Sequence, residues 1–170
     1  GKWLLLHRPM SGPFPMAMHL ADADTPEGPF HTRGRLASSY RYDDFALSWV
    51  GAAGPPHPLG DGRFVALYHQ GHYTYTHRRM YNLSAMLLDF ASENPVRARI
   101  EPILVPTGAR EQVGDPALGV DNVVFACASY RWNDDLVIPY AGADSRIFGA
   151  RVGWEALVEA LERKAEMGEE

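Results

Sequence analysis

The sequence predicts an all-β chain that ends in a single helix. At 170 residues and 46% hydrophobic composition, the chain is long enough for a real core and too apolar to be disordered. Its apolar residues fall in short runs, and 16 Gly and 13 Pro separate these runs. That punctuation is typical of many short strands joined by turns. Only the C-terminal end of the chain shows a clear helical period.

The predicted strands are short apolar segments, each bounded by Gly, Pro, Asn or Asp. In chain order they are residues 3–7, 16–20, 45–50, 63–69, 81–88, 98–104, 122–129, 136–140 and 147–152. Asp61-Gly62 and Asn133-Asp134-Asp135 are predicted to be hairpin turns, because Asn and Asp before Gly or in tight turns tolerate the required backbone angles.

The predicted helix begins near Trp154. Trp154, Leu157, Val158 and Leu161 recur at helical spacing, and Glu, Arg and Lys occupy the other faces. We therefore expect two parts, a partial β domain over residues 1–152 and a helix over 153–170 that packs on its outside.

The spacing of the strands favours propeller blades. Hairpins near residues 63–89 and 122–140 each begin with an aromatic and aliphatic strand and end in polar residues. Propeller blades repeat every ~40–50 residues with four strands each, so these strands would fill two blades and part of a third. The first residues already form a core strand, which predicts that the chain begins inside a larger domain.

Composition excludes some classes of partner. A net charge of −5 does not support nucleic-acid binding. No segment has the length and apolarity of a membrane span, and no signal peptide is visible, so we expect no membrane contact and a cytoplasmic location. The single cysteine, Cys127, cannot form an intrachain disulfide, and its apolar neighbours predict that it is buried.

Residues 61–89 are the part of the chain most informative about function. A strand ends in Tyr68-His69, a loop rich in Tyr, His and Arg follows, and a second strand stops at Asp89. Such residues at a strand end suit a polar, ring-shaped or anionic ligand. Tyr73, Tyr75 and Tyr81 are candidates for stacking on sugar faces, although alternate tyrosines are also ordinary on a half-buried strand.

Arg8 and Asp144 are further candidates. Arg8 precedes Pro9, which stiffens the turn, and its guanidinium suits carboxylate or phosphate; the alternative is a surface ion pair. Asp144 follows a strand among small residues, where it can hold sugar hydroxyls or cap its own turn. A metal-dependent hydrolase that uses His69, His72 and His77 is another alternative. Their spacing is not that of a zinc site, so no metal or cofactor is expected.

Several motifs, in order, resemble glycoside hydrolase family 130, five-bladed propellers that phosphorolyse or hydrolyse β-mannosides. The matching pieces are GKWLLLHRP at 1–9, GAAGPPHP at 51–58, DGRFVALYHQG at 61–71, YNLSAMLLD at 81–89, 99–106 with its Pro-Ile-Leu, 111–114, NVVF at 122–125 and YAGAD at 140–144. The resemblance implies that Arg8 and His69 bind phosphate and that Asp144 holds the mannosyl ring. It also implies that this chain is about the C-terminal half of a member and that the catalytic acid lies upstream.

One departure leaves the reaction open. Phosphorylases of the family carry a Lys just before the Gly-Pro-rich loop, and Trp49-Val50 stands there in this chain. The expected function is cleavage of a β-mannoside with inversion, with inorganic phosphate as co-substrate and mannose 1-phosphate as product. An inverting mannosidase is the alternative, for which Glu111 is the candidate base. A non-catalytic carbohydrate-binding or scaffold fragment is another. Expected partners are a mannose-containing oligosaccharide, phosphate, and either a second copy of the chain or an N-terminal half.

Overall fold

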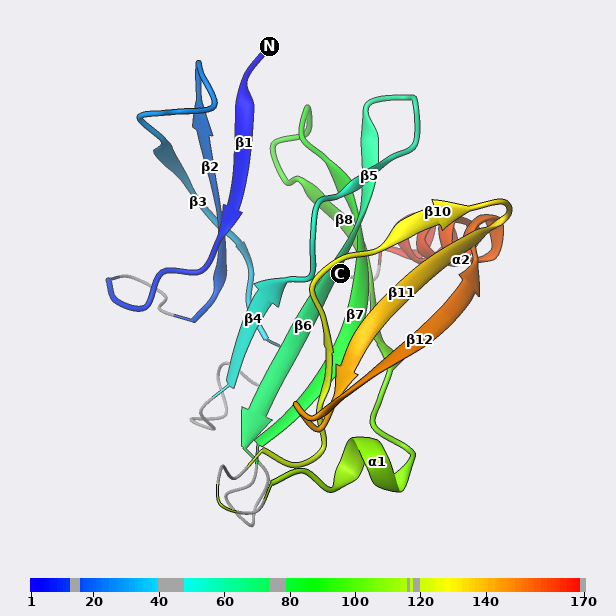
Figure 1. The fold of residues 1–170 in the computed structure, drawn as a ribbon. Helices are drawn as coiled ribbons and strands as arrows, with labels where there is room; N and C mark the ends of the chain where they lie inside the picture. The colour runs from blue at the N-terminus through cyan, green and yellow to red at the C-terminus, as the bar shows by residue number, and fades with distance from the viewer. Residues whose placement is uncertain (13–15, 40–47, 74–78, 116, 118–119, 169–170) are drawn as a thin grey trace.

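The computed structural model describes residues 1–12, 16–39, 48–73, 79–115, 117 and 120–168 (Figure 1). These residues form three antiparallel sheets and two helices. In chain order the elements are β1 (Trp3–His7), β2 (Met18–Ala23), β3 (His31–Ala37), β4 (Ser48–Ala52), β5 (His57–Pro58), β6 (Arg63–Tyr73), β7 (Arg79–Asp89), β8 (Val96–Leu104), α1 (Ala109–Gln112), β9 (Val124–Ala126), β10 (Tyr130–Trp132), β11 (Asp135–Gly142), β12 (Arg146–Gly153) and α2 (Trp154–Met167).

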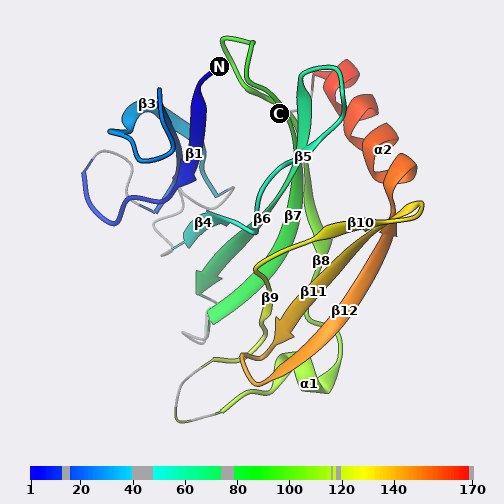
Figure 2. The same cartoon turned by 45° about the horizontal axis from the view of Figure 1, so that its top comes forward.

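The sheets follow one another along the chain and stand side by side, with the second sheet in the middle (Figures 1 and 2). Strands β1, β2 and β3 form the first sheet, β4, β6, β7 and β8 the second, with β5 also on β6, and β10, β11 and β12 the third, with β9 also on β11. Successive antiparallel meanders of this kind are propeller blades. The predicted fold class, propeller blades with a C-terminal helix, is therefore confirmed, with three sheets where two blades and part of a third were expected.

Two apolar clusters hold the middle sheet between its neighbours. Because side chains alternate along a strand, Val65 and Leu67 of β6 face the third sheet, while Ala66 and Tyr68 face the first. The cluster toward the third sheet also contains Trp154 of α2. Strand β6 pairs with β7 in unbroken register from Arg63–Asp89 to Tyr73–Arg79, so the middle sheet is a long, continuous platform.

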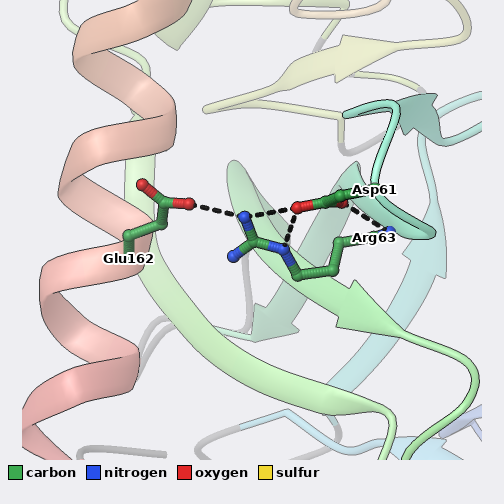
Figure 3. A network of polar contacts seen from close by, with 3 residues as sticks. All are labelled: Asp61, Arg63 and Glu162. Atoms are coloured by element: carbon green, nitrogen blue, oxygen red, sulfur yellow. Dashed lines mark hydrogen bonds and ion pairs between the residues drawn. The ribbon is translucent and has the colours of Figure 1, made fainter.

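Helix α2 packs on this platform as its periodicity predicts. Trp154, Leu157 and Leu161 are buried, and the helix ends at Gly168, whose φ of 69° is the left-handed conformation of a C-cap. Arg63 connects the helix to the turn before β6. Its Nε donates to Asp61 Oδ2 at 2.7 Å and its Nη2 donates to Glu162 Oε1 at 2.7 Å (Figure 3). The division of the chain at residue 152 into two parts stays a prediction.

Some elements differ from the sequence prediction. Strand β6 continues through Tyr73 instead of ending at His69. The prediction missed β3, β5, β10 and α1, which are short, polar or largely exposed and therefore show no apolar alternation. The turns at Asp61-Gly62 and Asn133-Asp134 are confirmed, and Asn133 has the positive φ of 51° that such turns require.

Cys127 is exposed, so the prediction of a buried cysteine is wrong. Strand β9 is shorter than the predicted strand 122–129 and ends at Ala126, so the chain has already left the sheet at Cys127. In the described part of the chain, neither helix has the length and apolarity needed to cross a bilayer.

Candidate functional site

A pocket of about 410 Å³ lies where the first and middle sheets meet strand β9. It brings together Arg8, His69 and Tyr81, which come from the end of β1 and from β6 and β7. The full lining is Leu6, His7, Arg8, Met10, Gly51, Ala52, His69, Tyr81 and Phe125. Three of the residues that the sequence predicted to bind phosphate or sugar therefore border one space.

Arg8 supplies the permanent positive charge of this pocket. Its guanidinium lies on Gly51 of β4, so close that a Cβ at Gly51 would be 3.5 Å from Arg8 Nη1. No Asp or Glu is among the lining residues that the structure describes. A pocket with an arginine and, among its described residues, no carboxylate is suited to an anion, because the guanidinium fork offers paired N–H donors.

His69 lines the same pocket as a buried, fully packed ring. Its side chain is 3% exposed and stacks on Phe125 with centroids 4.0 Å apart and an interplanar angle of 4°. The Ala126 backbone N–H donates to His69 Nε2 at 2.9 Å. Burial lowers the pKa of His69 to about 4, the positive Arg8 acts in the same direction, and the backbone of Gly51 opposes both. The ring is therefore neutral at neutral pH.

An aromatic wall continues from the pocket along the same face of the middle sheet. Trp49 makes edge contacts with Tyr73 and Tyr81, at centroid distances of 5.6 and 5.4 Å, and Tyr81 meets Phe125 at 5.6 Å. Trp49 can lie flat here because its cross-strand partner is Gly71. The residue at the position where the resemblance implies a Lys is thus a buried indole, which adds aromatic surface and no charge.

Asp144 sits beyond Tyr81 on the β11–β12 turn. Ala143 and Asp144 both have positive φ, 47° and 49°, which is the type I′ conformation usually reserved for Asn and Gly. The turn is tied to the wall: Ala143 N–H donates to Val123 O at 3.0 Å, and Tyr81 N–H donates to Asn122 O at 2.9 Å. The Asp144 side chain is exposed and is not part of the pocket lining.

Arg79 and Tyr73 lie near Asp144 at the end of the β6–β7 ladder. Arg79 Nε donates to Tyr73 Oη at 3.3 Å, and its carbon Cζ is 5.9 Å from the Tyr73 ring centroid. Hydrogen bonding to Tyr73 raises the pKa of Arg79, with smaller contributions from Tyr81 and Asp144. Tyr73, Tyr81 and Asp144, three of the predicted sugar ligands, therefore border one edge. Tyr75, the fourth, lies outside the described residues.

Glu111 has no free oxygen for a catalytic role. Its Oε1 accepts a hydrogen bond of 2.5 Å from Tyr140 Oη, and its Oε2 accepts from the backbone N–H groups of Thr107 and Gly108 at 3.0 and 2.7 Å. The carboxylate is 8% exposed and holds the first turn of α1 against β11. This engagement assigns Glu111 to structure rather than to activation of water.

Glu111→Gln is expected to lower the free energy of unfolding by on the order of 2 kcal/mol at neutral pH. The amide of glutamine keeps one acceptor oxygen, but its NH₂ group would then face donors such as the backbone N–H groups of Thr107 and Gly108. Burial opposes ionisation of Glu111, yet the hydrogen bonds from Tyr140, Gly108 and Thr107 outweigh it and lower its pKa. The carboxylate therefore stabilises the fold above the ordinary glutamate pKa, and that contribution is lost as the pH falls through the lowered value.

Urea unfolding of the parent and the Glu111→Gln variant from about pH 7 down to about pH 3 tests this role. The stability gap between them should close as the pH falls. A variant that unfolds like the parent at every pH but loses all turnover would show instead that Glu111 is a catalytic base.

The histidines do not form a metal site in the described part of the chain. His69 and His72 are three residues apart on β6, so their side chains point to opposite faces of the sheet. His77 lies outside the described residues. Among the residues that the structure describes, no group of three or more His, Cys, Asp or Glu side chains is placed to hold a metal ion.

Sequence reasoning missed the residues that make room for the site. In the sequence analysis, Phe125 and Gly51 occur only within motifs that resemble the family, and Gly71 only as the last residue of the motif at 61–71. Their roles depend on cross-strand neighbours: Gly51 pairs with His69, and Gly71 pairs with Trp49 and Tyr81. A glycine opposite an aromatic residue in a hairpin register is the signal that would have revealed the second case.

The chain is similar to known proteins in both sequence and structure. A family model described as beta-1,4-mannooligosaccharide phosphorylase matches residues 1–163. The 1,2-beta-oligomannan phosphorylase of Thermoanaerobacter sp. (strain X514) is 37% identical over 99 residues, which is 58% of this chain and 30% of that protein. The structure of β-1,2-mannobiose phosphorylase from Listeria innocua, in complex with β-1,2-mannobiose, aligns with a TM-score of 0.69 and 28% identity, covering 95% of this chain and 43% of that one. The chain thus spans less than half the length of either relative.

Proposed function

The chain belongs to glycoside hydrolase family 130, and we propose that the protein cleaves β-mannosides by phosphorolysis with inversion. The observation that carries this proposal is the Arg8 guanidinium, which lies on Gly51 in a pocket with no carboxylate among its described lining residues. Hydrolysis requires a carboxylate to activate water, whereas phosphate is already an anionic nucleophile and requires positive charge to place it.

In the proposed reaction, a phosphate oxygen attacks C1 of the terminal β-mannosyl unit. The new C1–O bond to phosphate forms as the glycosidic C1–O bond breaks, and inversion gives α-mannose 1-phosphate. A general acid gives its proton to the departing oxygen, which becomes a hydroxyl of the shortened oligosaccharide. None of the described residues in the pocket lining carries a carboxyl group, so the general acid would come from another part of the protein.

The described residues divide between the two substrates. Arg8 places the phosphate, and His69 borders the same space. Asp144, Tyr73 and Tyr81 contact the sugar: a carboxylate can accept from two hydroxyls, and tyrosine rings cover the apolar face of a pyranose. No cofactor takes part. A sugar-binding role for Tyr75, the cytoplasmic location and self-association stay predictions.

The partners in this proposal are a mannose-containing oligosaccharide and inorganic phosphate. Both similar proteins are named as phosphorylases of β-linked mannosides, and this likeness supports the substrate class. The inverting mannosidase is less well supported, because Glu111, its candidate base, has both oxygens hydrogen-bonded. A non-catalytic scaffold gives no reason for a pocket that contains an arginine.

The test is product analysis with the intact protein. β-1,2- and β-1,4-linked mannobiose are incubated with and without inorganic phosphate, and mannose 1-phosphate and free mannose are quantified separately. Phosphorolysis predicts mannose 1-phosphate in equimolar amount with the released sugar, and no turnover without phosphate. Free mannose at the same rate in both arms would assign a hydrolase, and no turnover of either disaccharide in either arm would favour the scaffold alternative.

A further inference from the structure

A histidine at the end of the sheets opposite the β11–β12 turn joins three elements (Figure 1). His57 is the first residue of β5, and its Nε2 lies 2.7 Å from Ser129 Oγ, so the two side chains are hydrogen-bonded. Its ring also meets the ring of Trp154, the first residue of α2, edge-on at a centroid distance of 5.9 Å. His57 therefore connects the middle sheet to the segment between β9 and β10 and to the C-terminal helix.

The backbone makes a close approach beside this contact. Gly54 has a φ of 113°, and a Cβ there would be 3.2 Å from Ala128 Cα and 3.3 Å from Cys127 O. The neighbouring Ala53 N–H donates to Leu67 O of β6 at 2.9 Å, which fixes this stretch of chain on the middle sheet. The segment that leads into β5 thus lies directly on the segment that leads into β10, and the two sheets meet there without space between them.

The charge nearest to the His57 ring is positive. Arg131 of β10 covers the Trp154 ring, with its Cζ 4.2 Å from the ring centroid. Strand β6 presents Val65 opposite His57, and α2 presents Trp154, and neither of these side chains ionises. Burial lowers the pKa of His57, and the positive Arg131 lowers it further. Among the described residues, Arg131 is the charged group whose field shifts this pKa.

Protonation of His57 would change the charge at this point and not the hydrogen bond. A protonated ring can still donate from Nε2 to Ser129 Oγ. It would, however, place a second positive charge near Arg131 in a partly buried position. The Arg131 side chain is exposed, so it can leave Trp154 and move into water. Trp154 would then lose its cation–π contact at the start of α2.

We propose that His57, Ser129, Arg131 and Trp154 form an acid-sensitive clamp, which is closed while the His57 ring is neutral and holds the start of α2 and the segment before β10 on the middle sheet. Because the pKa of His57 is lowered in the folded protein, the clamp contributes fully above the ordinary histidine pKa. That contribution is lost as the pH falls through the ordinary value toward the lowered one. The clamp does not rest on the proposed function, because it requires no substrate.

Hydrogen exchange of the intact protein, measured by mass spectrometry at about pH 7.5 and about pH 5.5 and corrected for intrinsic rates, tests the clamp. Protection of peptides from residues 127–134 and 153–161 should fall several-fold at the lower pH. The fall cannot exceed about tenfold, because an open form with an ordinary histidine pKa of about 6.5 gains at most that ratio. His57→Gln keeps a hydrogen-bonding group for Ser129 and cannot titrate, so it should lose this fall. An equal fall in the parent and in His57→Gln would overturn the proposal.

Three further variants separate titration from packing. His31→Gln is the matched control, because His31 is exposed on β3 outside the clamp, and it should keep the full pH-dependent fall. Ser129→Ala removes a hydrogen bond but no titrating group, so it should lower protection by a similar factor at both pH values. Arg131→Gln removes the repelling charge and should make the fall smaller. If His31→Gln abolished the fall as well, the effect would not belong to His57 and the clamp would be rejected.

NMR titration of the His57 ring in the parent decides the case if His57→Gln does not fold. A ring that stays neutral well below the ordinary histidine pKa supports the clamp, and a ring that becomes protonated at or above that value overturns it. Absence of phosphate-dependent turnover in the parent would reject the proposed function alone, because both readouts of the clamp are taken without substrate.

Discussion

Arg8→Ala is expected to lower kcat/KM for phosphate by on the order of 10²-fold, mainly through a higher KM. Arg8 is the one Lys or Arg among the described residues that line the pocket, and burial lowers the pKa of the neighbouring His69 to about 4. Trp49 occupies the position where the resemblance implies a second cation, and its indole is buried against Gly71. With Arg8 removed, phosphate would lose its water shell without any charge to replace it.

Initial rates measured against phosphate concentration, at saturating mannoside, provide the measurement. Arg8→Lys keeps the charge but loses the planar fork, so it should fall between the parent and Arg8→Ala. Arg151→Ala is the matched control, because Arg151 is an exposed arginine on β12 paired with Asp135, outside the pocket. If Arg8→Ala kept the phosphate KM of the parent, the anion would be bound elsewhere and the proposed site would be wrong.

Gly71→Ala is expected to lower the free energy of unfolding by on the order of 3 kcal/mol. A Cβ at Gly71 would fall inside the Trp49 indole, 2.6 Å from Cζ2 and nearer still to Nε1 and Cε2. Trp49 is 9% exposed and wedged between Tyr73 and Tyr81, so it has little room to move away. The same displacement should disturb Tyr81 and lower the rate of mannoside cleavage.

Urea unfolding followed by tryptophan fluorescence gives the size of the effect. Gly149→Ala is the control, because Gly149 is also a strand glycine but has no neighbouring atom within 4 Å of the place that a Cβ would take. In a Trp49→Ala background, Gly71→Ala should change the free energy of unfolding little, because the indole that the new Cβ would meet is already absent. An equal cost with and without the indole would show that Gly71 is required for its backbone freedom and not for the space it leaves.

The strand pattern explains how much of the fold was predictable. The hairpin formed by β6 and β7 was evident because both strands are long apolar runs separated by polar residues, and the C-terminal helix because its apolar residues share one face. Strands β3 and β10 were not evident: the first is polar and contains Gly34, and the second is three exposed residues. They are strands because neighbours offer hydrogen bonds, a cause that local sequence does not carry.

The site was predictable in its residue types and not in its chemistry. Arg8, His69 and Tyr81 were candidates from their place at strand ends, and they do line one pocket. Glu111 was a candidate base only because its partners were unknown; Tyr140, which occupies one of its oxygens, is 29 residues away. A sequence shows which polar side chains are present. Which of their oxygens and nitrogens are left without a hydrogen-bond partner depends on the residues that pack against them in the fold.

The sequence by itself determined the approximate position of most strands, the apolar face of the C-terminal helix, and the family motifs that stand in order from Gly1 to Asp144. Only the tertiary structure decided that the His69 ring is buried and accepts the Ala126 N–H, that Trp49 lies on Gly71, and that Glu111 is a structural carboxylate. Each of these depends on a partner brought by strand register or sheet packing, such as the Ala126 N–H, 57 residues from His69. Contacts between distant segments set burial and hydrogen bonding, and these set the charge state of the site.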